Sequence, residues 1–303
     1  MNKGKKVLVI GLDCAAPKVI FNDFINDCPN VKKIISKGVY GKLRSTDPPV
    51  TVPAWMVMAT SKSPGKLGVY GFRHRKNHSY SDYYLNISNS ITEPTIWDII
   101  GEKGLKSCII GIPPSYPPKK INGYCISGFL APDITSEYTY PPELKQEIKD
   151  NIGNYILDVQ FRIENREQVL KDIYEMTEIQ FKTIKYLIKN KDWHFFQFVL
   201  IGLDRMHHAF WKYYDKSHEK YIAGNNYESA IKDYYIYLDK KIGEILKLLD
   251  QDTQIMIVSD HGAKAMKGCI SINMALEKLG YLKFRNKPEP GTRIQDVEIE
   301  WDK

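Results

Sequence analysis

The sequence predicts an α/β fold in which helices cover both faces of a mostly parallel central sheet. Strand and helix patterns alternate along the 303 residues, which is typical of this class. Residues 106–112 and 193–201 are continuous apolar runs, as expected for strands that are buried on both faces. At three distant places an apolar run also ends directly in acidic or histidine side chains. We expect a single domain over residues 1–303.

In the first part of the chain, proline and glycine mark where elements begin and end. Gly38 follows a helical pattern and ends it, and Pro53 suits a first helical turn because its missing N–H has no partner there. Residues 66–92 are rich in Tyr, Ser and Asn and are expected to be a lid or insert segment. The expected strands are 6–12, 40–44, 106–112 and 124–129, and the expected helices are 17–26, 30–37, 53–60 and 93–103.

The second part of the chain contains the longest helical patterns. Residues 166–189 and 226–249 carry apolar side chains at helical spacing and are interpreted as scaffold helices. Residues 131–165 are irregular and form the second expected lid or insert segment. The expected strands are 193–201, 254–258 and 281–284, and the expected helices are 142–151, 166–189, 205–213, 226–249 and 273–279.

Composition excludes several classes of protein. The net charge is +7, which fits a lysine-rich surface or a basic approach to an anionic substrate, but no dense basic block indicates nucleic-acid binding. The five cysteines are odd in number and form no CxxC pair, which favours free thiols in a reducing compartment. No apolar stretch reaches the roughly 18 residues of a membrane span. We therefore predict a cytoplasmic protein without nucleic-acid or membrane partners.

Two candidate site residues lie at probable turns in the first part of the chain. Asp13 directly follows the first strand, so its carboxylate is expected to point into the crevice above the sheet. Thr51 lies two residues before Pro53, near the positive end of a helix, where backbone N–H groups bind phosphate oxygens. Either residue could instead be a helix N-cap. As a nucleophile, Thr51 would need a metal ion to lower its pKa.

Four further candidates follow two later strands. Asp204 and His208 are four residues apart and share one face of the expected helix, although His207, three residues away, competes on spacing alone. Asp260 and His261 follow the strand 254–258 directly. An aspartate in a turn with an incidental histidine is the alternative for this last pair.

These side chains form two expected metal sites. Asp13, Thr51, Asp260 and His261 suit one divalent ion, and Asp204 and His208 begin a second site that lacks a third ligand. Mixed nitrogen and oxygen ligands suit zinc or manganese, and catalytic zinc usually has three protein ligands and an open position. We expect two divalent metal ions, with zinc preferred.

In order and spacing, these motifs resemble the alkaline phosphatase superfamily, in particular its type I phosphodiesterase and nucleotide pyrophosphatase branch. The resemblance spans nearly the whole chain. It rests on Val9-Ile10-Gly11-Leu12-Asp13, Pro48-Pro49-Val50-Thr51-Val52-Pro53-Ala54-Trp55, Ser63-Pro64-Gly65, Gly202-Leu203-Asp204 with His208, and Ser259-Asp260-His261-Gly262. It implies an alkaline-phosphatase-like fold with lid insertions and a hydrolase of phosphoric ester bonds.

The resemblance also implies a role for each residue. Thr51 is the nucleophile of an in-line displacement that passes through a phospho-threonine. Asp13, Asp260 and His261 bind the ion that activates Thr51, and Asp204 and His208 bind the other ion, so that His208 is preferred over His207. The family's third ligand of the second ion is a later histidine, but no histidine follows His261 here. We therefore expect a C-terminally truncated chain with a weakened second site.

Three other functions are alternatives to this one. A sulfatase is disfavoured because Thr51 stands where that branch has a cysteine or serine. A phosphonate or phosphomonoester hydrolase remains open, since related enzymes also use threonine. A different class of protein, a metal-binding scaffold with little or no activity, would follow from the missing ligand. The leaving group of a small phosphate-ester substrate and the oligomeric state do not follow from the sequence.

Overall fold

The computed structural model describes residues 5–78, 82–289, 291–292 and 296–300, so that residues 79–81 of the first expected lid segment lie outside it. The chain divides into two compact units, Met1–Lys264 and Ala265–Lys303. All six candidate site residues belong to the first unit.

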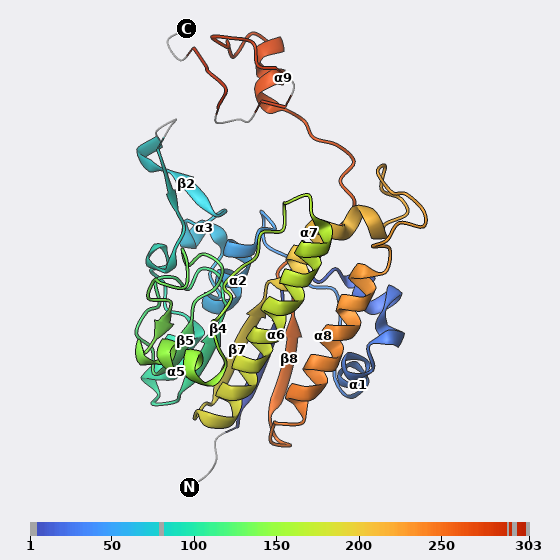
Figure 1. Cartoon of the computed structure of the whole chain (residues 1–303). Coiled ribbons are helices and arrows are strands. Elements are labelled where there is room, and N and C mark those ends of the chain that lie inside the picture. The colour runs from blue at the N-terminus through green and yellow to red at the C-terminus, as the bar shows by residue number, and fades with distance from the viewer. Residues whose placement is uncertain (1–4, 79–81, 290, 293–295, 301–303) are drawn as a thin grey trace. The chain divides into compact units, whose positions relative to one another are not determined.

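A six-stranded sheet forms the centre of the first unit, in the order β6-β5-β4-β7-β1-β8 (Figure 1). All neighbouring strands are parallel except the short edge strand β6, which runs antiparallel to β5. The strands are β1 Val7–Leu12, β4 Ser107–Ile110, β5 Gly123–Ile126, β6 Thr139–Tyr140, β7 Phe195–Leu200 and β8 Gln254–Val258. A separate hairpin pairs β2 Arg73–Arg75 with β3 Tyr83–Leu85.

Helices cover both faces of this sheet (Figure 1). Leu8 and Ile10 of β1 point into a core shared with α6, α7 and α8, whereas Val9 points into a second core shared with α2 and α4. The helices of the first unit are α1 Pro29–Lys37, α2 Thr51–Thr60, α3 Pro64–Leu67, α4 Ile96–Glu102, α5 Glu143–Asn151, α6 Arg166–Asn190, α7 Gly202–Tyr214 and α8 Ala230–Leu246. The predicted fold class is therefore confirmed.

Several predicted elements differ from the structure. Residues 40–44 form no strand, because no neighbouring strand pairs with them, and Val39 and Leu43 are fully or largely exposed. The predicted helix 17–26 is a π-helix at Val19–Asp23 followed by a 3-10 turn at Ile25–Asp27.

The second unit contains the helix α9 Ile272–Lys278. The predicted strand 281–284 is wrong, since only Phe284 pairs there, in an isolated bridge to Ile299. Across the described part of the chain, no helix is both long and apolar enough to span a membrane.

Candidate metal centre

The three central aspartates meet because their strands are neighbours in the sheet. β1 lies between β7 and β8, and all three run parallel. Asp13 follows β1 directly, Asp204 lies in the first turn of α7 behind β7, and Asp260 lies two residues beyond β8. The carboxyl ends of these strands therefore bring together residues that are up to 247 positions apart in the sequence.

Asp13, Asp260 and His261 form a compact triad whose ligand atoms lie within 4.8 Å of one another. His261 Nε2 is 3.6 Å from Asp13 Oδ1 and 3.3 Å from Asp260 Oδ2. Both of these carboxylate oxygens are buried, and neither has a hydrogen-bond partner among the described residues. His261 Nδ1 lies 3.1 Å from the carbonyl oxygen of Gly262, which can only accept, so Nδ1 is the donor in this contact and Nε2 is the ring nitrogen left to bind a cation.

Thr51 joins this triad from α2. It is the first residue of α2, and its Oγ1 lies 3.1 Å from His261 Nε2. Val50 is the N-cap of α2, and no side chain caps the helix. The alternative that Thr51 is an N-cap is therefore wrong. Asp13 also makes no cap: its Oδ2 accepts a hydrogen bond from Trp55 Nε1 at 2.9 Å.

Trp55 is a positioning residue that the sequence reasoning missed. It lies one turn after Thr51 on α2, so that one helix presents both the hydroxyl and the donor that orients Asp13. Its indole ring fits against Gly11, where an added Cβ would lie 2.8 Å from Trp55 Cη2. The spacing of four residues from Thr51 is the one feature of the sequence that could have indicated this role for Trp55. A tryptophan in an apolar helix otherwise predicts a core residue.

Asp204 and His208 lie beside the triad on α7. Asp204 Oδ1 is 3.5 Å from His208 Nε2, while Asp204 Oδ2 accepts a hydrogen bond from Arg205 at 2.8 Å. His207 is buried, and its ring packs against Trp211 and Tyr235 at centroid distances of 5.1 and 5.8 Å. Of the two histidines, only His208 thus faces Asp204.

Arg205 connects this aspartate to the irregular segment 131–165. Its guanidinium donates to both carboxylate oxygens of Asp158 at 2.7 and 2.6 Å and stacks on Phe161 at 4.5 Å. Phe161 in turn packs against the ring of His208. No local pattern in the sequence indicates this pairing, because Arg205 and Asp158 are 47 positions apart.

The electrostatics of the centre disfavour negative charge without a cation. Burial, reinforced by the carboxylates of Asp260 and Asp204, raises the pKa of Asp13 well above its ordinary value. Burial also raises the pKa of Asp260, against the opposing effect of His261. Burial together with Asp204, Asp13 and Asp260 raises the pKa of the Cys14 thiol.

These features fit a divalent cation at the triad. Buried carboxylates need a partner, and here two unpaired oxygens converge with the lone pair of an imidazole. At Asp204 the fit is partial, because only His208 joins it from the expected ligands. The structure thus brings together all four expected ligands of the first ion, and it brings Asp204 and His208 together at the second position.

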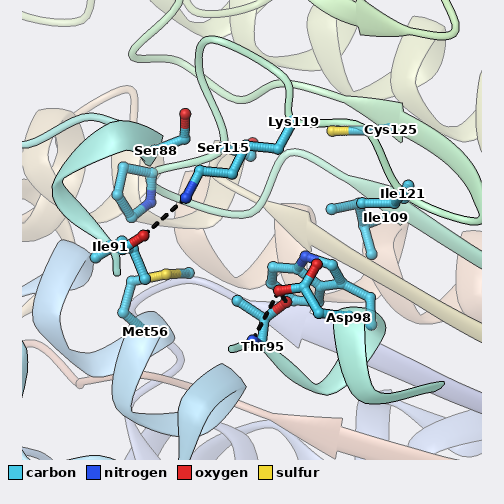
Figure 2. A pocket seen from close by; sticks show the side chains of 12 residues that line it. Met56, Ser88, Ile91, Thr95, Asp98, Ile109, Ser115, Lys119, Ile121 and Cys125 are labelled. Carbon is cyan, nitrogen blue, oxygen red and sulfur yellow. Dashed lines mark hydrogen bonds between the residues drawn. The ribbon is translucent and has the colours of Figure 1, made fainter. Parts of the chain in front are cut away.

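The small cavity in Figure 2 is separate from the candidate metal centre. Its volume is about 30 Å³, and none of the six candidate residues lines it. Lys119 Nζ crosses one side to donate to the Ile91 carbonyl at 2.7 Å. The volume suits a water molecule rather than a substrate.

Comparison with protein families identifies the relatives of this chain. Residues 7–300 match the model of type I phosphodiesterase / nucleotide pyrophosphatase. The chain belongs to this family. The predicted relationship is therefore confirmed, and the family's phosphodiesterases and pyrophosphatases are hydrolases of phosphoric esters and anhydrides. A comparison of the sequence with curated proteins gave no match.

Solved structures with the same fold include two classes of enzyme. Phosphonoacetate hydrolase from Sinorhizobium meliloti 1021 in complex with phosphonoformate superposes with a TM-score of 0.59 at 16% identity, over 91% of this chain and 62% of the other. The complex of that enzyme with phosphonoacetate superposes with a TM-score of 0.60 at 14% identity, over 95% of this chain and 66% of the other. A 2-O GAG sulfatase superposes with a TM-score of 0.54 at 13% identity, over 89% of this chain and 62% of the other. The chain thus spans about two thirds of the length of these proteins.

Proposed function

We propose that this protein is a metal-dependent hydrolase of phosphoric esters, of the phosphodiesterase and nucleotide pyrophosphatase type, with Thr51 as its nucleophile. One observation carries the proposal: the Thr51 hydroxyl lies 3.1 Å from His261 Nε2, at the edge of a triad with two unpaired buried carboxylate oxygens. A hydroxyl with only a structural role would not need to lie beside such ligands. Membership of the family supports the same reaction class.

The position of Thr51 suits attack on a phosphoryl group. The first turn of α2 leaves backbone N–H groups without partners inside the helix, and the positive end of the helix favours an anion there. In the reaction, the Thr51 hydroxyl loses its proton and the bond from Thr51 Oγ1 to phosphorus forms while the bond from phosphorus to the leaving oxygen breaks. The leaving alcohol takes up a proton in turn. Water then attacks the phospho-threonine, releases the phosphate product and restores the Thr51 hydroxyl.

Two divalent ions, with zinc as the proposed metal, complete this site. Asp13, Thr51, Asp260 and His261 would hold the first ion, and Asp204 and His208 contribute to the second. Such ions lower the pKa of a hydroxyl and offset charge on the phosphoryl oxygens. The mixture of imidazole and carboxylate donors supports zinc, with manganese as the second choice.

The segment 131–165 is proposed as a lid beside the site. The lid proposal is supported by two contacts of this segment: Asp158 binds Arg205, and Phe161 packs against His208. We propose a small phosphate ester as substrate, with neither nucleic acid nor membrane as a partner. A cytoplasmic location is supported by five free cysteines.

Hydrolysis of bis-(p-nitrophenyl) phosphate with added zinc or manganese tests the proposal. Thr51→Ala should abolish turnover, whereas Thr60→Ala is the matched control, since Thr60 lies on the same helix and its hydroxyl bonds the Met56 carbonyl. A phosphomonoester and phosphonoacetate, assayed in parallel, distinguish the reaction classes. Equal turnover in the wild type and Thr51→Ala would contradict the proposal, and bound metal without any turnover would favour a scaffold.

A further inference from the structure

We propose that Arg205 is a positioning residue for the second cation. In this role it holds Asp204 in place through one hydrogen bond and joins that ligand to the segment 131–165 through Asp158. The inference rests on the proposed function only in taking Asp204 and His208 to bind a cation. It goes beyond that function because it gives the segment a part in metal binding as well as in covering the site.

The two expected ligands on α7 are already spaced for one ion. Asp204 Oδ1 lies 3.5 Å from His208 Nε2. An oxygen and a nitrogen ligand of one tetrahedral zinc ion stand roughly 3.3 Å apart, because each bond is about 2.0–2.1 Å long. The other oxygen of Asp204 accepts a hydrogen bond from Arg205 Nη1 at 2.8 Å. Oδ1 is therefore the oxygen of this carboxylate that faces the histidine.

The bond between Arg205 and Asp204 is held from outside α7. Neighbouring residues on a helix do not face each other, so adjacency alone does not bring these two side chains together. The guanidinium is fixed by Asp158, to which it donates from Nε at 2.7 Å and from Nη2 at 2.6 Å. The rings of Phe129 and Phe161 also lie against it, with centroids 4.9 and 4.5 Å from its Cζ. These contacts fix the direction in which Arg205 donates to Asp204.

The same segment also contacts the other ligand of the pair. Phe161 packs against the ring of His208 at a centroid distance of 5.4 Å. The segment 131–165 thus reaches Asp204 through Arg205 and reaches His208 directly. Groups that orient metal ligands in this way typically contribute 10–100-fold to metal affinity.

The positive charge of Arg205 could have the opposite effect. A guanidinium beside a metal ligand repels a cation and competes with it for the carboxylate. Here Asp158 forms an ion pair with the same guanidinium, so that its negative charge balances Arg205. The pair can then orient Asp204 without adding net charge. Orientation and competition therefore predict opposite changes in cation affinity when Arg205 is replaced.

The zinc affinity of the full chain tests this role, measured by competition with a chromophoric chelator so that the two ions give separate dissociation constants. His208→Ala identifies the constant that belongs to the second ion. Arg205→Met removes the donor, and Asp158→Asn removes the balancing charge while it keeps the size of the side chain. Arg166→Met is the matched control, because Arg166 also contacts the segment, through a hydrogen bond to the Phe161 carbonyl at 3.1 Å.

We expect zinc to bind about 10–100-fold more weakly at the second position in Arg205→Met, and at least about 10-fold more weakly in Asp158→Asn. The first constant should stay unchanged in both, and both constants should stay unchanged in Arg166→Met. The double variant should lose no more affinity than Arg205→Met, because both substitutions act through the same bond. Urea unfolding in chelator shows whether each variant is folded, and the isosteric Asp158→Asn carries the test where Arg205→Met is not.

Unchanged or higher zinc affinity at the second position in the folded variants would overturn the inference, since Arg205 would then be a competing charge or a purely structural tie. An equal loss in Arg166→Met would overturn it as well. A wild-type chain that binds a single ion would overturn it together with the second cation of the proposed function. None of these readouts needs turnover, so Thr51-dependent hydrolysis can hold where this inference fails, and the inference can hold where hydrolysis is absent.

Discussion

Trp55→Phe tests how far the site depends on one buried hydrogen bond. The indole N–H donates to Asp13 Oδ2 at 2.9 Å, and Trp55 is only 1% exposed. Loss of a bond to a carboxyl group costs about 1.5–3 kcal/mol, because water cannot replace the donor. The smaller ring adds roughly 1 kcal/mol of lost burial. We expect the free energy of unfolding in chelator to fall by about 2.5–4 kcal/mol.

The same change should also weaken metal binding. Trp55 lowers the pKa of Asp13, so its removal makes the carboxyl harder to ionise for a cation. Groups that orient metal ligands typically contribute 10–100-fold in affinity, and we expect a loss of about this size for zinc. Urea unfolding gives the stability, and competition with a chelator gives the affinity.

Trp97→Phe is the control for this experiment. Trp97 belongs to the same apolar cluster as Trp55 but lines the cavity of Figure 2 rather than the site. It should show the packing loss of roughly 1 kcal/mol and normal zinc affinity. Equal effects of the two substitutions on zinc affinity would refute the role assigned to Trp55.

Three further predictions concern stability. Gly11→Ala should lower the free energy of unfolding in urea by about 1–3 kcal/mol, because its Cβ would lie 2.8 Å from Trp55 Cη2 and Val199 Cγ2. Gly41→Ala is the control and should leave stability unchanged, because a Cβ there has no atom within 4 Å. Unchanged stability of Gly11→Ala would contradict the close packing at Gly11. Arg205→Met should lower the free energy of unfolding by about 3 kcal/mol, because it leaves the carboxylates of Asp204 and Asp158 without their ion-pair partner. Lys185→Met, at the more exposed ion pair with Glu244, should lower it by at most about 1 kcal/mol. Similar losses in the two variants would argue against a buried ion-pair network at Arg205. The pKa of Asp13 is raised in the folded protein, so in chelator its contribution to stability is full below its ordinary pKa of 3.8 and is lost as pH rises through the folded pKa. The free energy of unfolding of Asp13→Asn should therefore rise relative to that of the wild type as pH rises. A difference between the two proteins that stays constant with pH would be inconsistent with the raised pKa.

The convergence of the aspartates could be predicted from the sequence, since an acidic residue after a buried apolar run stands at the carboxyl end of a parallel strand. Asp13 and Asp260 follow this rule, and the strand before Asp260 was predicted with its observed bounds. The start of α2 at Thr51 was close to predicted because Pro53 marks a first turn.

Other features depend on contacts that the sequence does not encode locally. A strand at 40–44 needs a neighbouring strand, and none lies beside these residues in the described part of the chain. Spacing along the helix does not distinguish His207 from His208 as the partner of Asp204. The distinction appears only in the structure, where His207 is buried against Trp211. The sequence predicts a free thiol at Cys14 but contains no sign that its turn faces Asp204.

A trapped intermediate tests most directly whether Thr51 attacks phosphorus. Zinc-loaded protein would be mixed with bis-(p-nitrophenyl) phosphate and quenched in acid within the first turnovers, and its peptides would be examined by mass spectrometry. We predict a p-nitrophenylphosphoryl adduct on Thr51 in the wild type and none in Thr51→Ala. Turnover with no adduct at Thr51, or with an adduct on another residue, would contradict the account.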